Sequence, residues 1–391
     1  MRRGGNVAGP RVAFVSAWGG PDWATPRTPR EEELVTVSTR LLALLLAAPL
    51  LLAADMTGKA QIGQAGVLDF GPPGVLFVGD SQTASVWALD TGDTTAGSGQ
   101  VNINGLNEKV AAMLGVLPDQ ILINDVVVNP ISKRVYIAVS RGLGPDAAAV
   151  ILRTDSSGKL TELSLDNITH SKVSLSNAPA LDAKDRRGRA LRVQSITDLH
   201  FLDGKVFVAG LSNEEFASKL RSVPYPFAAA DDGASVEIYH GAHGRWETRS
   251  PVRTFIPYEI KSEPHLLAAY TCTPLVKFPV KDLKPGSKIV GTTIAELGNR
   301  NRPLDMITYS KDGGEYILMS NSSRGVMKMS TKGIEKHDAI TKPVEDKEGL
   351  SYETIASLKG VEQLDKLDDS HALILARAES GSLDLKTIAL P

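Results

Sequence analysis

The chain has 391 residues, of which 42% are apolar, so it is long enough to bury a large core as one or two domains. Its 43 lysine and arginine residues nearly balance its 45 aspartate and glutamate residues, which gives a formal net charge of -2. A chain this balanced lacks the electrostatic footprint of a nucleic-acid-binding protein and gives no reason to expect an anionic membrane as partner, so both classes are set aside.

The first 54 residues predict two segments ahead of the folded domain. Residues 1–34 are rich in Gly, Pro and Arg and lack an amphipathic period, so we expect a disordered extension or an over-extended gene start. Residues 41–54 read LLALLLAAPLLLAA, an apolar run that follows Arg40 and is too short to span a bilayer. Residues 35–54 are therefore predicted to be a signal peptide, and the mature protein to be periplasmic or secreted in a bacterium. An uncleaved anchor is the alternative.

Beyond residue 60 the chain consists of short apolar runs bounded by Gly, Pro, Asn and Asp, which is typical of an all-β domain. One unit recurs: a short strand with an acidic residue near its start, a turn, a strongly apolar strand, a polar turn and an alternating strand. The apolar second strands read GVLFVGDS, RVYIAVSR, KVFVAGLS, HLLAAYTC, EYILMSNS and HALILARA. With weaker fourth strands, these six units resemble a β-propeller, in which each blade buries its faces against its neighbours.

The predicted fold class is therefore all-β: a six-bladed β-propeller of four-stranded antiparallel blades over residues 58–391, with short helices in the loops of one face. Its architecture resembles that of the secreted lactonase and YVTN-repeat propellers. The sixth unit ends after its third strand, so we expect GKAQIG, residues 58–63, to supply the missing outer strand and to close the ring from the N-terminal side.

Gly79, Asp80 and Ser81 follow an apolar strand and resemble the nucleophile block of the SGNH hydrolases. Asp368 and His371 have the spacing that these enzymes use for the base and its orienting carboxylate. In the repeat, however, the Gly-Asp-Ser stretch aligns with the turn between second and third strands. The residues after it alternate like a strand, whereas the hydrolase family needs a helix there. We therefore favour the turn and keep the hydrolase as an alternative.

Long connections gather on one face of the predicted propeller, which we call the top face. The first strand of each blade runs down the channel from this face, so the turns between second and third strands and the links between blades return to it. The spacing of Leu106, Val110 and Leu114 predicts a helix in one such link, and a second short helix is expected over Glu214–Leu220. Loops on a rigid scaffold usually carry binding, so we expect the top face to hold a small ligand or a protein partner.

Acidic residues recur near the starts of the first strands, where they would surround the entrance of the channel: Asp69, Asp125, Asp198, Glu259 and Asp305. Carboxylates this close repel one another, so they need a cation, an arginine or backbone N–H groups as partners. Capping of backbone N–H groups is the favoured interpretation, and a Ca²⁺ ion held by these five residues is the alternative. Arg300 and Arg302 lie beside the same rim, where they would neutralise the ring or hold an anionic ligand.

The other candidate residues are predicted to be structural. His240 and His243 fall in a turn, and two histidines alone do not make a zinc site. Cys272 is the only cysteine, so the chain forms no internal disulfide. It follows an apolar run and is expected to be a small buried hydrophobe.

The sequence thus predicts an exported, monomeric binding propeller with no membrane contact after signal cleavage. Its candidate ligand-binding residues are Asn124, Asp198, Arg300 and Arg302, and no catalytic residue is assigned. The alternative is an enzyme similar to the calcium-dependent lactonase propellers. That resemblance implies a channel Ca²⁺ that polarises a lactone carbonyl and activates water, with Asn124 joining the aspartates as a ligand.

Overall fold

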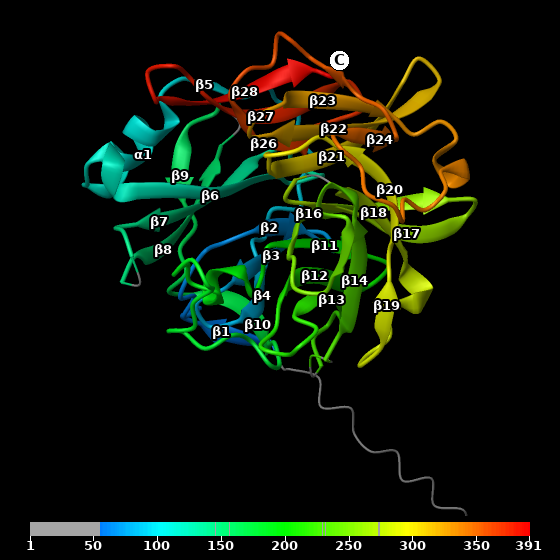
Figure 1. Cartoon of the computed structure of the whole chain (residues 1–391). Helices are drawn as coiled ribbons and strands as arrows, with labels where there is room; N and C mark the ends of the chain where they lie inside the picture. Colours follow the sequence, from blue (N-terminus) through cyan, green and yellow to red (C-terminus); the bar gives the residue numbers. More distant parts are fainter. Residues whose placement is uncertain (1–54, 145, 156, 229, 231, 273) are drawn as a thin grey trace, which may run out of the picture. The chain divides into compact units, whose positions relative to one another are not determined.

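The structure is a computed structural model, and it describes residues 55–391 apart from residues 145, 156, 229, 231 and 273. The predicted N-terminal extension and signal peptide, residues 1–54, lie outside the described residues. Six β-sheets dominate the described part (Figure 1). No helix in this part of the chain has the length and apolar character needed to cross a membrane.

Each sheet is one blade, and we name each blade after its innermost strand. From the inside outward, blade β2 consists of β2 (Leu68–Phe70), β3 (Val75–Asp80), β4 (Ser85–Asp90), β10 (Ile168–Ser174) and β1 (Met56–Gly58). Blade β6 consists of β6 (Ile121–Val128), β7 (Val135–Arg141), β8 (Ala148–Thr154) and β9 (Leu160–Glu162). Blade β11 consists of β11 (Asp198–Leu202), β12 (Lys205–Leu211), β13 (Ser218–Pro224), β14 (Ala234–His240) and β15 (Arg245–Glu247). Blade β16 consists of β16 (Val252–Ile260), β17 (Glu263–Tyr270), β18 (Pro274–Pro279), β20 (Thr292–Leu297) and β24 (Lys347–Gly349). Blade β21 consists of β21 (Pro303–Lys311), β22 (Gly314–Asn321), β23 (Gly325–Ser330) and β25 (Glu353–Thr354). Blade β26 consists of β26 (Val361–Lys366), β27 (His371–Arg377), β28 (Leu383–Ala389) and β5 (Asn102–Ile103). The chain is a six-bladed β-propeller, as predicted.

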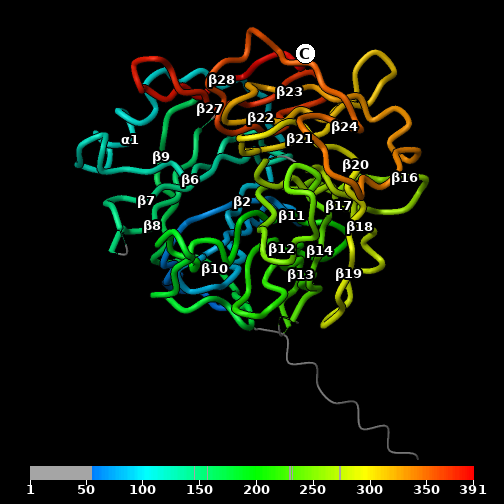
Figure 2. The backbone as a smooth tube through the Cα atoms, in the orientation of Figure 1, coloured from blue at the N-terminus to red at the C-terminus, as the bar shows by residue number. Residues whose placement is uncertain are grey.

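The blades stand around the ring in an order that differs from their order in the sequence. The first strands contact one another in the circular order β6, β2, β11, β16, β21 and β26 (Figure 2). The hydrophobic core follows the same order, because each of its clusters is shared by two neighbouring blades; Phe77 and Val86 of blade β2, for example, pack with Leu199 and Val206 of blade β11. The chain therefore places blade β6 on one side of blade β2 and then returns to the other side to build blade β11.

Strands β5 and β10 are among the strands that join a blade other than the one that precedes them in the sequence, and they hold this arrangement together. On its way back from blade β6, the chain adds β10 to the outer edge of blade β2, where it pairs with β4. On its way out, β5 pairs with β28 and completes the last blade. The prediction that residues 58–63 close the last blade is wrong, because β1 pairs with β10 instead. The open edge of the last blade can pair with any segment that lies beside it. The segment that lies there is β5, in the link between blades β2 and β6.

The structure has one α-helix among the described residues, α1 (Leu106–Leu114), and it confirms the predicted spacing because Leu106 and Val110 are buried. Short 3-10 helices occupy links and turns: η1 (Pro118–Gln120), η2 (Arg192–Gln194), η3 (Gly241–His243), η4 (Val280–Asp282) and η5 (Ile334–Lys336). The helix expected over Glu214–Leu220 is wrong. Residues from Ser218 onward form β13, which pairs along all of β12 and buries Leu220 and Val223. Pairing to a neighbouring strand overrides the local helical pattern here. The short strand β19 (Lys288–Val290) pairs in parallel with β14 of the neighbouring blade.

Candidate functional site

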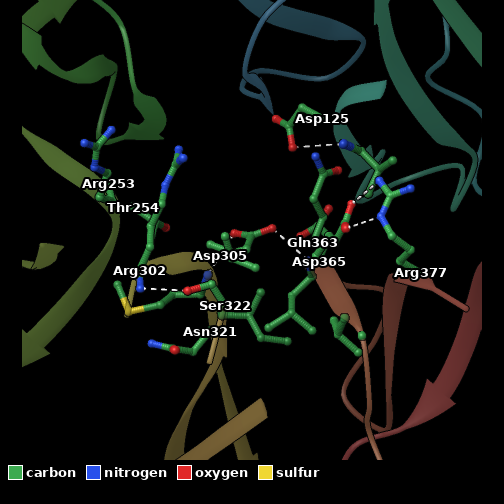
Figure 3. A pocket seen from close by; sticks show the side chains of 18 of the residues that line it. Asp125, Arg253, Thr254, Arg302, Asp305, Asn321, Ser322, Gln363, Asp365 and Arg377 are labelled. Atoms are coloured by element: carbon green, nitrogen blue, oxygen red, sulfur yellow. Dashed lines mark hydrogen bonds and ion pairs between the residues drawn. The ribbon is translucent and has the colours of Figure 1, made fainter. Parts of the chain in front are cut away.

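A cavity of about 1220 Å³ opens where the first strands of the six blades converge (Figure 3). Its walls are the starts of these strands, together with the turn at residues 321–325 and the link at residues 354–360. A second-to-third-strand turn and a blade link thus lie at its mouth, as expected for the top face. A smaller cavity of about 430 Å³ adjoins it and shares the side chains of Asn124, Arg253 and Arg302.

Five aspartates line the cavity, and each carboxylate links its own blade to the next one. Asp125 accepts a hydrogen bond from the N–H of Leu68 at 2.6 Å. The other links run from Phe201 to Asp69 (2.6 Å), Phe255 to Asp198 (2.8 Å), Leu364 to Asp305 (2.7 Å) and Val128 to Asp365 (2.6 Å). Four of the five also accept the N–H of the residue that follows them. This is the backbone-capping role that the sequence favoured, and we call these residues the aspartate ring.

In three of the five blades that carry a ring aspartate, a bulge in the first strand sets the position of the carboxylate. In β6 and β21 the aspartate directly follows the bulge, whereas in β26 the residue after the bulge is Gln363 and the aspartate comes two residues later. The corresponding positions in β16 are Thr254 and Ile256. Ile256 packs instead in the apolar cluster that joins this blade to blade β21, so no ring carboxylate links these two blades.

The predicted ring was therefore wrong at one position and incomplete at another. Glu259 lies opposite Pro264 at the far end of β16, where it is exposed and distant from the mouth. The sequence prediction took the first strand of this unit to be short. The strand β16 has nine residues, and the residues that line the cavity, Arg253 and Thr254, are near its start. Asp365 was missed because the repeat aligns Gln363 with the other acidic positions, and Asp365 lies two residues further along the same face of β26.

Burial between the blades raises the pKa of every carboxyl group in the aspartate ring. The pKa of Asp69 rises to about 6 and that of Asp365 to about 7. For Asp125 and Asp305 the pKa lies well above its usual range, because repulsion by other ring carboxylates adds to burial. A nearby imidazole, that of His200, acts in the opposite direction on Asp69; its Nδ1 lies 3.8 Å from the carboxylate.

This hydrogen bonding does not suit the calcium site that the sequence offered as an alternative. The ring oxygens face backbone N–H groups of two blades each and do not converge on one point. The side-chain amide of Asn124 donates to the carbonyl of Ala65 at 2.6 Å and to Ser140 Oγ at 2.9 Å, so it too is engaged. Among the described residues, no group of three candidate metal ligands gathers in the channel.

Two arginines at the mouth carry charge that no carboxylate of the described residues neutralises. Arg253 stands in the bulge of β16 and donates from Nε to Thr271 Oγ1 at 3.0 Å. Burial, together with the positive charges of Arg302 and Arg189, lowers the pKa of Arg253 to about 10. Arg253 and Arg302 lie on the same side of the pocket (Figure 3). We call them the arginine pair.

Two other arginines at the mouth differ from the arginine pair because each has an anionic partner. Arg377 forms a bidentate pair with Glu362, and Arg324 lies 3.5 Å from Asp346. Arg300, which the sequence placed beside Arg302 at the rim, is exposed and lines neither cavity. Arg253 was missed, although it precedes an apolar strand start much as Arg302 does.

Gly79, Asp80 and Ser81 form a turn, as favoured from the sequence. The buried carboxylate of Asp80 accepts backbone N–H groups of Gly63 and Thr83, at 2.7 and 3.0 Å. Ser81 Oγ donates to the carbonyl of Ile196 at 3.1 Å. His371, at the start of β27, lies at the opposite end of its blade from the top face that carries Ser81. The Ser–His hydrolase alternative is therefore wrong.

No protein-family model matches the chain, and no curated protein matches it either. Among solved structures, it is similar to the arabinanase Arb43A of Bacillus subtilis, with 12% identity, a TM-score of 0.34 and coverage of 69% of this chain and 94% of the arabinanase. It is also similar to a glucose dehydrogenase, with 11% identity, a TM-score of 0.32 and coverage of 86% and 100%. A GH43 glycoside hydrolase gives 10% identity, a TM-score of 0.33 and coverage of 69% and 52%. Likenesses this distant carry no inference about function.

Proposed function

We propose that the chain is a binding propeller whose top face holds a small anionic ligand, with the carboxylate or phosphate group of that ligand between Arg253 and Arg302. The observation that carries the proposal is the arginine pair: two guanidinium groups at a cavity mouth with no anionic partner among the described residues. A guanidinium group binds planar and tetrahedral anions through parallel N–H donors. An anion placed between the two would also relieve the repulsion that lowers the pKa of Arg253.

The surrounding cavities suit a ligand of this kind. Their volumes of about 1220 and 430 Å³ reach the range of small-molecule sites. The negative charge of the ligand would stay with the arginine pair at the mouth, because the aspartate ring below repels anions. An uncharged, hydroxyl-bearing part of the same ligand would extend toward the ring, whose oxygens retain capacity to accept hydrogen bonds.

Calorimetric titration of the full chain with inorganic phosphate and with a panel of mono- and dicarboxylates tests this proposal. We expect one class of anion to bind, and Arg253→Gln or Arg302→Gln to weaken its affinity at least tenfold, since each removes a charge-assisted contact. Arg300→Gln is the matched control, because Arg300 carries the same charge nearby but lines neither cavity. The proposal fails if no anion binds, or if the control loses as much affinity as Arg302→Gln.

The calcium-dependent lactonase is not supported, because the aspartates that would bind Ca²⁺ accept hydrogen bonds from backbone N–H groups of neighbouring blades. Export from the cytoplasm and a monomeric state remain predictions from the sequence. Fractionation of the producing cell and sedimentation of the purified chain would test them.

A further inference from the structure

Three potential metal ligands meet on the top face, apart from the arginine pair. His240 ends β14, His243 lies in η3, and Cys272 lies in the turn between β17 and β18 of the neighbouring blade. One ligand atom from each residue lies within 4.8 Å of the other two. The two imidazole rings are 3.8 Å apart between centroids. His240 is buried and Cys272 is partly exposed, unlike the solvated and buried positions predicted for them from the sequence, whereas His243 is exposed as predicted.

One carboxylate orients both imidazoles. Glu247, on β15, lies with Oε2 at 3.0 Å from Nδ1 of His240 and with Oε1 at 2.7 Å from Nδ1 of His243. Its own position is held by Ser250 Oγ, which donates to Oε2 at 2.5 Å. With Nδ1 of each ring engaged, Nε2 is the atom left to bind something else. Metal-binding histidines are commonly held by a carboxylate in this way.

The buried end of His240 has no partner that would explain its position. The residue is 1% exposed, and its Nε2 makes no hydrogen bond in the described structure. A buried ring nitrogen without a partner is unfavourable unless a ligand completes it. This observation is independent of the clustering and points to the same place.

We infer that His240, His243 and Cys272 bind one transition-metal ion, Zn²⁺ in first place, through the two Nε2 atoms and Sγ. Two nitrogen ligands and one thiolate suit Zn²⁺ and copper, whereas Ca²⁺ requires oxygen ligands. Tetrahedral zinc needs ligand atoms about 3.5 Å apart, and since those of the cluster lie within 4.8 Å of one another, a small movement would bring them to that spacing. The His243 side chain is 41% exposed and is free to make that movement.

Three protein ligands leave the fourth position of zinc open, which is the arrangement of catalytic rather than purely structural sites. The turn that holds Cys272 contacts the backbone and side chains around the arginine pair. Arg253 donates to Thr271, the residue before Cys272, and the N–H of Cys272 donates to the carbonyl of Asn301, the residue before Arg302. The metal site stands on its own residues and does not depend on the proposed anion binding.

The backbone of Cys272 supplies a variant that separates loss of metal from loss of fold. Its φ is 63°, in the left-handed region where glycine is favoured over residues with a side chain. Cys272→Gly therefore removes the thiol and suits the turn, so the variant is expected to fold.

The test is a titration of the full chain with Zn²⁺ against a chelating dye, followed by metal analysis after desalting. We expect one Zn²⁺ per chain, affinity at least 100-fold weaker in His240→Gln and in Cys272→Gly, and no loss of thermal stability of Cys272→Gly in chelator. His371→Gln is the matched control, because His371 also has its Nδ1 against a carboxylate, that of Asp368, but lies far from any cysteine. It should bind zinc like the unmodified chain.

A parallel titration with Cu²⁺ identifies the metal. Stoichiometric binding with a thiolate-to-copper absorption band that Cys272→Gly abolishes would support the site and assign copper to it. The inference is overturned if neither metal binds stoichiometrically, or if binding survives both His240→Gln and Cys272→Gly. It is equally overturned if His371→Gln loses as much affinity as these variants.

Discussion

The aspartate ring and the cluster of His240, His243 and Cys272, here called the His–Cys cluster, both bring several titratable side chains together on this propeller. They differ in whether the polar atoms of those side chains already have hydrogen-bond partners. In the ring, each carboxylate accepts hydrogen bonds from backbone N–H groups, and these bonds link neighbouring blades. In the cluster, Glu247 occupies only one nitrogen of each imidazole and leaves a buried Nε2 of His240 without a partner. Saturated polar groups are structural, whereas groups that are held in place but incompletely paired are available for binding.

The arginine pair belongs with the cluster in this comparison. Arg253 is held by one hydrogen bond to Thr271, yet its charge has no carboxylate partner among the described residues. The sequence alone favoured the aspartates over these residues, since the acidic repeat is conspicuous in the chain whereas Cys272 lies far along the chain from His240 and His243. Four substitutions test this distinction.

The largest effect is expected from Asp125→Ala in the aspartate ring. The substitution leaves the N–H groups of Val126 and Leu68 without their acceptor and removes a link between two blades, so we expect a loss of about 2–4 kcal/mol in the free energy of unfolding. Urea unfolding of the full chain measures it. Glu259→Ala, at the exposed end of β16, should change that free energy by less than about 0.5 kcal/mol. Equal losses in the two variants would show that the ring has no structural role.

The extent of what sequence could predict follows from the same contrast. The blades and their number were predictable, because apolar second strands such as residues 135–141 recur with polar turns at each end. The ring order was not, because β5 is only 2 residues long and β10 is mostly polar, and which open edge each one joins depends on the whole assembled ring. Local pattern specifies a strand but not its partner.

The candidate sites show the same limit. The carboxylates at the starts of the first strands were found because they repeat, whereas Arg253 and Asp365 were missed because bulges shift the register between blades. The His–Cys cluster joins residues of two blades. A turn in each blade brings Cys272 and His240 together, and nothing in the local sequence around either residue indicates the other.

A smaller effect is expected in the dependence of stability on pH. The pKa of Asp365 is raised to about 7 in the folded chain, so the folded state binds its proton more tightly than the unfolded state does. That group therefore contributes stability below about pH 4, and the contribution is lost as pH rises through 7. Asp365→Asn should flatten the rise in stability between pH 8 and pH 5 by up to about one proton, or about 1.4 kcal/mol per pH unit. Unfolding by urea at several pH values measures this slope.

Asp369→Asn is the control for this pH dependence. Lys366 lowers the pKa of Asp369 through a hydrogen bond and ion pair, which is the opposite direction. Replacing it should leave the slope between pH 5 and 8 unchanged. If Asp365→Asn also left the slope unchanged, burial of the ring carboxyl would not be felt as a shift in its pKa.

A gain of about 0.5–1 kcal/mol is expected for the metal-free chain when Cys272 becomes glycine. The left-handed backbone at this residue costs roughly 1–2 kcal/mol with a side chain present, and the greater freedom of glycine in the unfolded chain offsets part of the relief. Cys272→Ser keeps the strained backbone and should show no gain. Thermal unfolding in chelator compares the two, and a glycine variant no more stable than the serine variant would contradict the strain at this turn.

A similarly small effect is expected from Ser81→Ala, at the residue whose surroundings resemble a nucleophile in the sequence. Its hydroxyl donates one hydrogen bond to the carbonyl of Ile196, so its removal should cost about 1 kcal/mol of unfolding free energy. Asp80→Ala should cost more, because Asp80 accepts from backbone N–H groups of Gly63, Gln64 and Thr83 and from the Thr83 hydroxyl. In a hydrolase the order of importance would be reversed for activity: the serine would be indispensable for cleavage of an activated ester such as p-nitrophenyl acetate. An ester-cleaving activity that Ser81→Ala abolished would contradict the assignment of this stretch as a turn, whereas the order expected for stability follows from its hydrogen bonds alone.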